Sequence, residues 1–401
     1  MVTQLAFFDD DYRTALFPLA ATRPVCEFRF GIFTVREKWE RRTGFSSVTL
    51  AAQALQEIWP FNPQPDAGLI WINGRVAPSA LLVQEVLALQ PGQALIKGEL
   101  LIACNAGTDQ TPLLLGDSDH LRINFDLQES TGEAIVIRRI HDLFTHNRRA
   151  LQLDFELITG NNFVPLSSTC TVIGQHPVYI EQGAVAEACT FNTKEGPVYI
   201  AAGAEIMEGS IVRGPIAICE GAQVKMGTKL YADSTIGPGC KVGGEITNTI
   251  FFANSNKSHD GYLGNSVIGE WCNLGADTNT SNLKNNYGPV SVWNYAIGGD
   301  EDTGLIFHGL IMGDHAKCGI NTMFNTGTVV GVFANVFGSG FPPKFIPDFS
   351  WGGADGLTEY SLPKAIETAE RVFARRKKTV DAPLRKLLTS LFERSAQYRK
   401  F

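Results

Sequence analysis

The chain has 401 residues, of which 44% are hydrophobic and 19% are charged, and its formal net charge is -7. This composition is that of a soluble globular protein with room for two domains, and it excludes a disordered or collagen-like chain. The acidic balance argues against nucleic acid as a partner, because phosphate binding needs a basic surface, and no apolar run is long enough to span a bilayer.

Two further features narrow the class of protein. Asp9, Asp10 and Asp11 stand near the N-terminus, where a signal peptide would need cations, so we expect a cytoplasmic protein. The eight cysteines are scattered and form no Cys-x-x-Cys pair. A zinc ribbon or a disulfide scaffold is therefore not expected, and the cysteines fit the role of small buried hydrophobic residues.

Residues 1–160 have the alternating pattern of an α/β domain. We expect strands at Val2–Phe8, Ala67–Ile72 and Ala134–Ile140, and helices at Ser79–Ala88 and Ile140–Asn147. Glycine and asparagine cluster at 159–165, and we expect the domain to end there.

A repeat of six residues dominates the middle of the chain. Aliphatic or other apolar side chains recur at this spacing in three runs: Ile200, Ile206, Val212, Ile218, Val224, Leu230, Ile236 and Val242; Ile268 and Leu274; and Ile306, Met312, Cys318, Phe324, Val330 and Val336. Helices repeat near 3.6 residues and ordinary strands near 2, so neither explains a period of six. A β-sandwich with a coincidental spacing is the alternative.

The period of six predicts a left-handed parallel β-helix over residues 165–350. Each short rung points one apolar side chain inward, where it stacks on the rungs above and below, and small residues or glycine turn the corners. The period breaks between Val242 and Ile268 and again between Leu274 and Ile306, in segments rich in Asn, Ser, Asp and Gly. Loops leaving a rigid coil are where function tends to be placed. After the coil, residues 357–401 are expected to form helices, with Pro363 and Pro383 in their first turns.

The segment 257–288 carries the residues that point to chemistry. His259 is followed by Tyr262 after three residues, by Asn273 after fourteen, and by Asn282 after twenty-three. An acyl transfer from a thioester to an amine needs a base, for which a neutral histidine is suited near pH 7. A sugar acceptor needs amide and hydroxyl partners, and its phosphate needs a cation. A histidine that only caps a surface turn is the other interpretation.

This segment resembles the acetyltransferase half of the bifunctional GlmU family, which acetylates glucosamine 1-phosphate and uridylylates the product to UDP-N-acetylglucosamine for the cell envelope. The family motif is matched at His259, Tyr262, Asn273, Ala276 and Asn282; Gly275 and Thr278 match as well. The sequence departs from it at Asp277, where the family has Gly, and at Leu283, where it has Tyr, so that Asn286-Tyr287 competes with Asn282 for the Asn-Tyr role.

The resemblance implies a role for each matched residue. His259 would be the general base, Tyr262, Asn273 and Asn282 would bind the acceptor, and Lys229 or Lys257 would meet its phosphate. The resemblance further implies acetyl-CoA as the donor, bound between neighbouring coils of a homotrimer. The implied acyl-CoA residues are Ala276 and Lys284, the lysine nearest to a family lysine that has no match in register.

The N-terminal segment resembles a divergent sugar nucleotidyltransferase. Arg13, Pro18-Leu19 and Arg23-Pro24 fall where that signature has its Arg, Pro-Leu and Pro-Lys, but Asp9, Asp10 and Asp11 replace the glycines that approach the phosphates. Acidic side chains beside a triphosphate need a metal ion between them, so Mg²⁺ is the implied cofactor and no metal ligand is assigned. The candidate nucleotide-binding cations are Arg13, Arg23 and Lys38.

Three alternatives to an acetyltransferase coupled to sugar-1-phosphate nucleotidyl transfer stay open. The chain could transfer only nucleotidyl groups and use its β-helix as a trimerisation scaffold, or it could bind a sugar nucleotide without catalysis. A γ-type carbonic anhydrase would need three convergent histidines around zinc. The repeat region offers four, which occupy different places in the hexads: His176, His259, His308 and His315.

Overall fold

The computed structural model describes residues 2–64, 68–107, 125–158, 160 and 162–401. Contacts divide the chain into two compact units. Unit 1 comprises residues 1–14, 22–28 and 33–138, and unit 2 comprises residues 15–21, 29–32 and 139–401. This division falls ahead of the boundary expected at 159–165, because the helices before residue 159 pack within unit 2.

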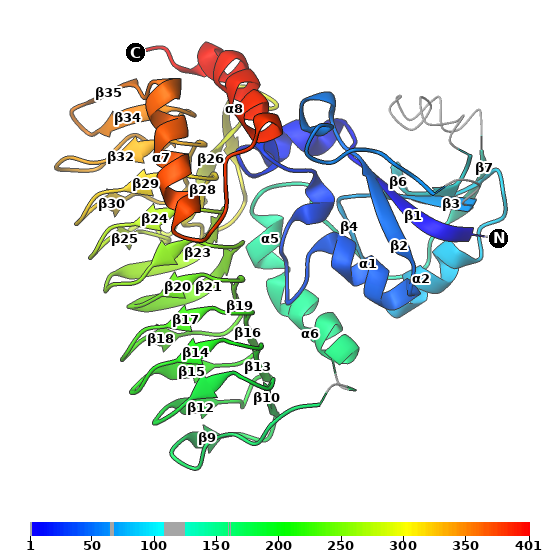
Figure 1. Ribbon diagram of the computed structural model, residues 1–401, viewed down its shortest axis with the longest axis horizontal. Helices are drawn as coiled ribbons and strands as arrows, with labels where there is room; N and C mark the ends of the chain where they lie inside the picture. The colour runs from blue at the N-terminus through cyan, green and yellow to red at the C-terminus, as the bar shows by residue number, and fades with distance from the viewer. Residues whose placement is uncertain (1, 65–67, 108–124, 159, 161) are drawn as a thin grey trace. The chain divides into compact units, whose positions relative to one another are not determined.

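Unit 1 is built on one mixed sheet with the strand order β2-β1-β3-β6-β5-β7 (Figure 1). β1 runs parallel to β2 and β3, whereas β6 is antiparallel to β3 and β5. The strands are β1 (Val2–Phe8), β2 (Ser46–Leu50), β3 (Gly68–Asn73), β5 (Gln93–Lys97), β6 (Leu100–Asn105) and β7 (Asp126–Glu129), with β4 (Val76–Pro78) paired to β8 (Ala134–Val136). Trp71, Phe8 and Leu101 belong to the buried core cluster of this sheet.

The expected elements of this region are largely confirmed. β1 has the predicted bounds, β3 runs one residue beyond the expected strand, and Ala67 lies outside the described residues. The strand that begins at Ala134 ends at Val136, four residues early. Helix α1 (Val35–Thr43) begins at a capping box in which the Thr34 hydroxyl accepts from the Glu37 N–H, and α2 (Ala80–Leu87) begins at Ser79 as expected.

Unit 2 is a left-handed parallel β-helix, as the period of six predicted (Figure 1). Short rungs stack in parallel on three faces, and two long strands, β21 and β23, each pass from the third face into the first. The first face holds β10 (Val178–Ile180), β13 (Val198–Ile200), β16 (Ile216–Ile218), β19 (Ser234–Ile236), β28 (Leu310–Met312), β31 (Thr328–Val330) and β33 (Phe345–Ile346).

The other two faces complete each coil. The second face holds β11 (Val185–Ala186), β14 (Glu205–Ile206), β17 (Gln223–Val224), β20 (Lys241–Val242), β22 (Asn256–Lys257), β24 (Asn273–Leu274), β29 (Lys317–Cys318), β32 (Asn335–Val336) and β34 (Ser350–Gly353), which turns back into β35 (Gly356–Glu359). The third face holds β9 (Thr171–Ile173), β12 (Thr190–Asn192), β15 (Ile211–Arg213), β18 (Lys229–Leu230), β21 (Glu245–Phe251) and β23 (Tyr262–Ile268), and β25 (Asn279–Thr280) pairs separately with β30 (Met323–Phe324).

The inward positions are the ones that the repeat predicted, with one exception. All predicted positions from Ile200 to Leu274, and those from Met312 to Val336, are buried in one continuous core cluster. The prediction for Ile306 is wrong, because its side chain is 46% exposed. Ile306 follows a hairpin, β26 (Ser291–Asn294) with β27 (Gly299–Asp302), that leaves the coil, and the register resumes only at Leu310.

The corners of the coil use left-handed backbone at residues other than glycine. Positive φ occurs at Trp271, His315, Phe333 and Phe349, and their rings stack in a column along the coil axis, with 4.4 Å between the His315 and Phe333 centroids. Helix α7 (Leu362–Ala374) covers this column, with the Phe373 ring 4.4 Å from Trp271, and α8 (Ala382–Ser395) packs beside α7. The two predicted C-terminal helices are therefore confirmed, with a proline at N1 or N2 of each.

Two helices and a short N-terminal segment pack against the coil within unit 2. α5 (Asp142–Thr145) packs on β21 and β23, and α6 (Asn147–Ile158) packs on β19. The segment 29–32 is fixed there by buried hydrogen bonds, since Asn147 Oδ1 accepts from the Gly31 N–H at 2.7 Å and Thr235 Oγ1 donates to the Gly31 carbonyl at 2.8 Å. The predicted helix at Ile140–Asn147 is shorter than expected, and α6 follows it.

Candidate active sites

The predicted base, His259, lies on an exposed corner where the second and third faces of the coil meet. The turn 258–261 joins β22 to β23, and the turns Gly243-Gly244 and Ala276-Asp277 stack beside it. A Cβ on Gly243 would lie 2.4 Å from the Ser258 carbonyl oxygen, so glycine is required for this close stacking. Together with Lys225 and Met226 these turns line a cavity of about 500 Å³ that contains the His259 side chain.

Lys257 occupies an inward position of the coil, where its neighbours in the column are apolar. It pairs in register with Val242 and is 1% exposed. Its ammonium group donates to the carbonyl oxygens of His259 at 2.8 Å, Asp260 at 3.1 Å and Gly243 at 3.3 Å. Burial lowers the pKa of Lys257 to about 8, although Asp260 opposes that shift. The side chain therefore fastens the backbone of the His259 turn from inside the coil.

The third face brings the Tyr262 and Asn282 side chains together. Asn282 Nδ2 donates to Tyr262 Oη at 2.9 Å and to Asn265 Oδ1 at 2.8 Å, and the Tyr262 N–H donates to Asn279 Oδ1 at 2.8 Å. Burial raises the pKa of the Tyr262 phenol. This phenol and the amides around it form a hydrogen-bonding surface of the kind that a sugar ring requires.

Lys229 and Glu245 continue the column that contains Tyr262. Lys229 pairs in register with Glu245, and Glu245 pairs with Tyr262, so the three side chains follow one another along the third face. Lys229 Nζ lies 3.9 Å from Glu245 Oε2, and the lysine side chain is 60% exposed. A cation, a carboxylate and a phenol thus lie on successive rungs beside the corner that carries His259.

The remaining candidates of the β-helix do not share this face. Asn273 is exposed on the second face, in register with Asn256 and Lys317. Ala276 lines the cavity of His259, whereas Lys284 donates to the carbonyl oxygen of Pro289 outside it.

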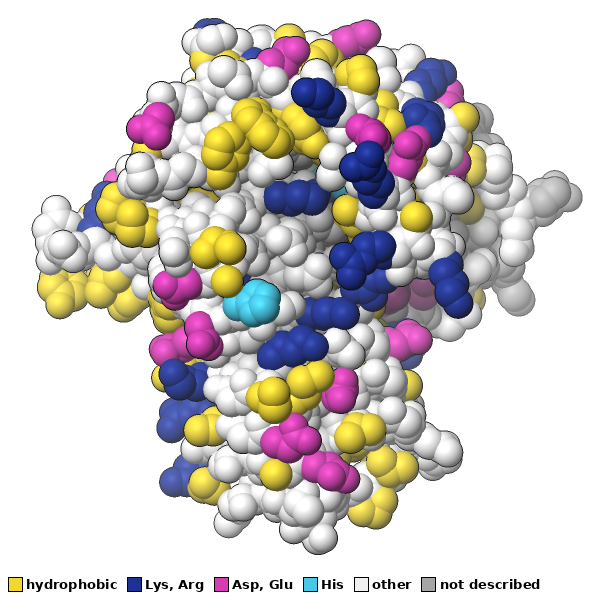
Figure 2. Space-filling view, turned by 60° about the vertical axis from the view of Figure 1, so that its left-hand side comes forward, with side chains coloured by type: hydrophobic (Ala, Val, Ile, Leu, Met, Phe, Trp, Pro, Cys, Tyr) yellow, Lys and Arg dark blue, Asp and Glu magenta, His cyan; other side chains and the backbone are white. Residues whose placement is uncertain are grey.

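A group of cations lies beside the cavity of His259. Burial, followed by the charges of Arg376, Lys225 and Arg375, lowers the pKa of Lys241. The Arg376 guanidinium also donates to the Gly239 carbonyl oxygen at 2.9 Å. Figure 2 shows Lys and Arg side chains gathered on this side of the coil, together with a histidine. These four cations, called here the basic group, form a surface suited to an anionic ligand.

The histidines of the repeat region do not converge on a metal. His308 is buried against Phe144 and His141, with ring centroids 5.2 and 5.7 Å away, and burial lowers its pKa to about 3. His315 belongs to the aromatic column of the corner. Within the described part of the chain, no three His, Cys, Asp or Glu side chains are placed to hold a metal ion.

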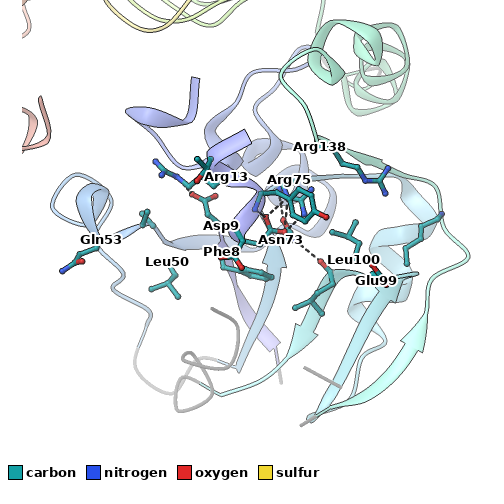
Figure 3. Close-up of a pocket in the computed structure, with 18 of the residues that line it drawn as sticks. Phe8, Asp9, Arg13, Leu50, Gln53, Asn73, Arg75, Glu99, Leu100 and Arg138 are labelled. Carbon is teal, nitrogen blue, oxygen red and sulfur yellow. Dashed lines mark hydrogen bonds and ion pairs between the residues drawn. The ribbon is translucent and has the colours of Figure 1, made fainter. Parts of the chain in front are cut away.

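A second cavity, of about 980 Å³, lies in unit 1 at the carboxyl ends of β1, β2 and β3 (Figure 3). Its lining includes Arg13, Arg75 and Arg138 together with the aspartates that replace the glycine loop. Arg13 Nε lies 3.2 Å from Asp9 Oδ2, and burial raises the pKa of Asp9 to about 6. The carboxyl edge of such a sheet is where nucleotides bind in open α/β folds.

Of the three cations that the sequence suggested for nucleotide binding, one lies in this cavity. Arg13 lines it, whereas Arg23 and Lys38 are buried, with 8% and 2% of their surfaces exposed. Arg75 and Asn73 were missed, as was Glu245 in the coil. Arg75 could have been found from its position just after a predicted strand, because the carboxyl ends of parallel strands meet at one edge of the sheet. Glu245 falls in the interval where the repeat is interrupted, and no signal marks it.

Comparisons with known proteins match parts of this chain. Residues 5–162 match the sequence model of a family described as sugar nucleotidyl transferase. The bifunctional protein GlmU of Methanocaldococcus jannaschii is 38% identical over 87 residues, which are 22% of this chain and 21% of that protein. GlmU of Methanococcus maripaludis strain C5 is also 38% identical over 87 residues, which are 22% and 20% of the two chains. The match thus spans about a fifth of each curated relative.

Among solved structures, the UDP-N-acetylglucosamine acyltransferase of Francisella novicida aligns at 13% identity over 59% of this chain and 79% of that chain, with a TM-score of 0.31. Residues 5–162 thus resemble sugar nucleotidyl transferases, and a stretch of 87 residues is similar to the bifunctional protein GlmU. The larger unit is a hexapeptide-repeat β-helix. The helices in its described residues are all too short or too polar to cross a membrane.

Proposed function

We propose that the β-helix is an acetyl-CoA-dependent N-acetyltransferase that acts on an amino-sugar phosphate such as glucosamine 1-phosphate. The observation that carries this proposal is the His259 turn, which is open to a cavity on one side and fastened from the coil interior by Lys257 on the other. A base that is exposed to substrate and has a fixed backbone has the preorganisation that acyl transfer needs.

In this proposal each residue has a chemical task. The imidazole of His259 takes a proton from the acceptor amine as the amine nitrogen attacks the thioester carbonyl. The C–S bond then breaks, and coenzyme A leaves as a thiolate that takes up the proton. Tyr262, with Asn282 and Asn279 beside it, hydrogen-bonds the sugar ring. Lys229 meets the phosphate, and Glu245 attracts the ammonium form of the amine before it is deprotonated. Lys257 is a positioning residue, because its ammonium group is occupied by three backbone carbonyls.

The donor is proposed to bind along the basic group. Acetyl-CoA supplies the acetyl group as a thioester and carries phosphates. Lys225, Lys241, Arg375 and Arg376 offer the cations that such phosphates need, and Lys225 also lines the cavity of His259. A homotrimer, in which a neighbouring coil closes this surface, is part of the same proposal and derives from the likeness to GlmU.

Unit 1 is proposed to transfer a nucleotidyl group to a sugar 1-phosphate. The cavity at the carboxyl edge of β1–β3 and the match over residues 5–162 support this. Because Asp9 and Asp10 are already paired with arginines, Mg²⁺ would arrive bound to the phosphates of the nucleoside triphosphate. Magnesium-dependent pyrophosphate release from UTP and N-acetylglucosamine 1-phosphate tests this activity separately from acetylation.

The test of the acetyltransferase is release of thiol from acetyl-CoA in the presence of glucosamine 1-phosphate. We expect His259→Ala to lose at least about 100-fold in kcat, the usual contribution of a general base, with an unchanged thermal midpoint. His176→Ala is the matched control, since His176 is also exposed but lies in the first coil, between β9 and β10. Equal turnover by both variants would contradict the assignment, and absence of sugar-dependent release by the wild type would favour the scaffold alternative.

A further inference from the structure

The cavity of unit 1 contains a carboxylate held as a bound anion would be held (Figure 3). Arg75 follows β3 and is 2% exposed. Its Nε donates to Asp10 Oδ1 at 2.8 Å and to Oδ2 at 3.1 Å, and its Nη2 also donates to Oδ2. Asn73 Nδ2 adds a further hydrogen bond to Asp10 Oδ2, at 2.8 Å. The Tyr12 N–H also donates to Asp10 Oδ1, at 3.2 Å. Asp10 therefore occupies a cradle formed by one edge of a guanidinium group and one amide, and it accepts a further hydrogen bond from its own loop.

This donor set does not distinguish a carboxylate from a phosphate. The planar fork of a guanidinium group binds either oxyanion through two parallel hydrogen bonds. Arg75 is also held independently of Asp10, because its Nη1 donates to the Ile137 carbonyl oxygen at 3.4 Å. The backbone N–H of Arg75 donates to Asn73 Oδ1 at 3.0 Å, which orients the amide as well. The cradle is thus fixed by contacts other than the carboxylate inside it.

The two partners differ in their freedom to move. The Arg75 side chain is 2% exposed, whereas that of Asp10 is 23% exposed. Asp10 lies in the connection after β1, and the following residues, Asp11 and Tyr12, are exposed. Tyr12 also lines the cavity. A ligand entering the cavity can therefore replace the carboxylate without disturbing the arginine.

We propose that Asp10 is an internal competitor for the phosphate site of this cavity: a phosphate group of the ligand binds Arg75 and Asn73 in its place. The proposal rests on the proposed nucleotide-binding role of unit 1 and deepens it by naming the residues that receive the phosphate. The cavity, at about 980 Å³, accommodates a nucleoside diphosphate or a sugar phosphate, and both carry the group that the cradle binds.

The exchange has an electrostatic consequence. Once displaced, the Asp10 carboxylate lies near the incoming phosphate, and Asp9 and Asp11 are its neighbours in the sequence. Like charges at this distance repel, and a divalent cation between them offsets the repulsion. Binding to the wild-type chain should therefore depend strongly on Mg²⁺, and neutralising Asp10 should remove much of that dependence.

The test is calorimetric titration of the full chain with inorganic pyrophosphate, first without a divalent cation. We expect Asp10→Asn to bind pyrophosphate at least about tenfold more tightly than the wild type, since a neutral amide competes for the guanidinium group less well than a carboxylate does. Asp11→Asn is the matched control, because it removes the same charge from an exposed neighbour and leaves the cradle occupied. It should shift affinity by no more than about threefold. Titrations with UDP and with glucose 1-phosphate then identify which source of phosphate the cavity prefers.

Asp10→Ser provides the same test if the asparagine variant does not fold, because the shorter serine side chain leaves the cradle empty. Affinity of the Asp10 variant equal to that of Asp11→Asn, or below that of the wild type, would overturn the proposal and make Asp10 a ligand-binding residue or a structural one. Neither result bears on acetylation, which is read from thiol release in the other unit. Tight binding without pyrophosphate release would leave the exchange intact and contradict only the nucleotidyl transfer.

Discussion

At the scale of single residues, the lysine inside the coil is the feature that most constrains the proposed chemistry. A charged group at an inward position destabilises the folded state unless its hydrogen-bonding groups are paired. The Lys257 ammonium group meets that condition, since it donates to three carbonyl oxygens. Two of those oxygens belong to the turn that carries His259. Burial of the ammonium group is thereby coupled to the position of the base.

Replacing Lys257 with methionine keeps an unbranched side chain that is one atom shorter and removes the three hydrogen bonds. We expect kcat for acetyl transfer to fall by about tenfold or more while KM for the sugar changes little, because positioning of a base acts on the chemical step. The carbonyls left without a partner should also lower the free energy of unfolding by about 1–3 kcal/mol. Steady-state kinetics and thermal unfolding measure both effects, and an unchanged kcat would argue against the positioning role.

The same lysine predicts a dependence of stability on pH. Its pKa is lowered in the folded chain, to about 8 from the ordinary 10.5, so between these values the unfolded chain binds more protons. The free energy of unfolding contributed by this group should therefore rise as pH increases from 8 to 10.5. Burial lowers the pKa of Lys317 to about 8 as well, so two groups contribute. Unfolding midpoints measured across this range should rise less steeply in Lys257→Met, and identical slopes would contradict the assignment.

Lys229 offers a test of acceptor recognition. Lys229→Met should raise KM for glucosamine 1-phosphate by about tenfold, the loss expected for one charge-assisted contact to a phosphate. Unphosphorylated glucosamine serves as the control substrate, since it lacks the group that the lysine is proposed to meet. The effect should shrink at high salt, because the side chain is 60% exposed. An equal rise in KM for both sugars would show that Lys229 does not contact the phosphate.

At the scale of elements, the aromatic column at one corner links the coil to its C-terminal helices. In the column of Trp271, His315, Phe333 and Phe349, the first two rings contact Phe373 of α7. The Phe349 ring contacts Phe392 of α8. Stacking of equivalent positions on successive coils is what lets a short rung gain stability from its neighbours. The column therefore belongs to the repeat even though its four members are of three residue types.

Phe373→Ala should loosen α7 from the coil. Loss of a buried phenylalanine side chain removes about 3–5 kcal/mol of packing, and hydrogen exchange of the α7 amides would report it as faster opening of that helix. Arg371→Ala is the control on the same helix, since the Arg371 side chain is 77% exposed and should change little. Unchanged exchange in α7 after Phe373→Ala would show that the helix is held by other contacts.

At the scale of the whole molecule, each of the two units is formed by several separate segments of the sequence. Unit 2 includes residues 29–32, where the Ile32 N–H donates to Asp154 Oδ2 at 2.7 Å and the Gly31 N–H to Asn147 Oδ1 at 2.7 Å. A buried acceptor that loses its donor costs about 1–3 kcal/mol. The coil therefore depends on a segment that precedes most of unit 1 in the sequence.

A fragment of residues 139–401 should consequently unfold at a lower temperature than the same unit in the full chain. Differential scanning calorimetry compares the two, and Asp154→Ala in the full chain reproduces part of the loss without removing unit 1. If the fragment unfolds at the same temperature as the full chain, the bonds to Gly31 and Ile32 contribute nothing measurable to the coil.

The sequence by itself determined the β-helix and the location of its proposed base. Inward positions such as Ile200 and Val330 repeat every six residues because each rung contributes one buried side chain, and such periodicity is visible without coordinates. The C-terminal helices were found for a similar reason, since proline in a first turn is a local signal. The window around His259 was identified by its resemblance to the GlmU family motif at His259, Tyr262, Asn273 and Asn282.

The tertiary structure decided the features that depend on register between coils. The interruptions of the repeat hide how many residues each coil contains, so the alignment of Lys229, Glu245 and Tyr262 could not be counted from the sequence. The inward direction of Lys257 was hidden in the same way, and a lysine is ordinarily expected at the surface. The Asp10–Arg75 pair joins residues 65 positions apart, and only the folded sheet edge brings a carboxylate and a guanidinium group into contact over that separation.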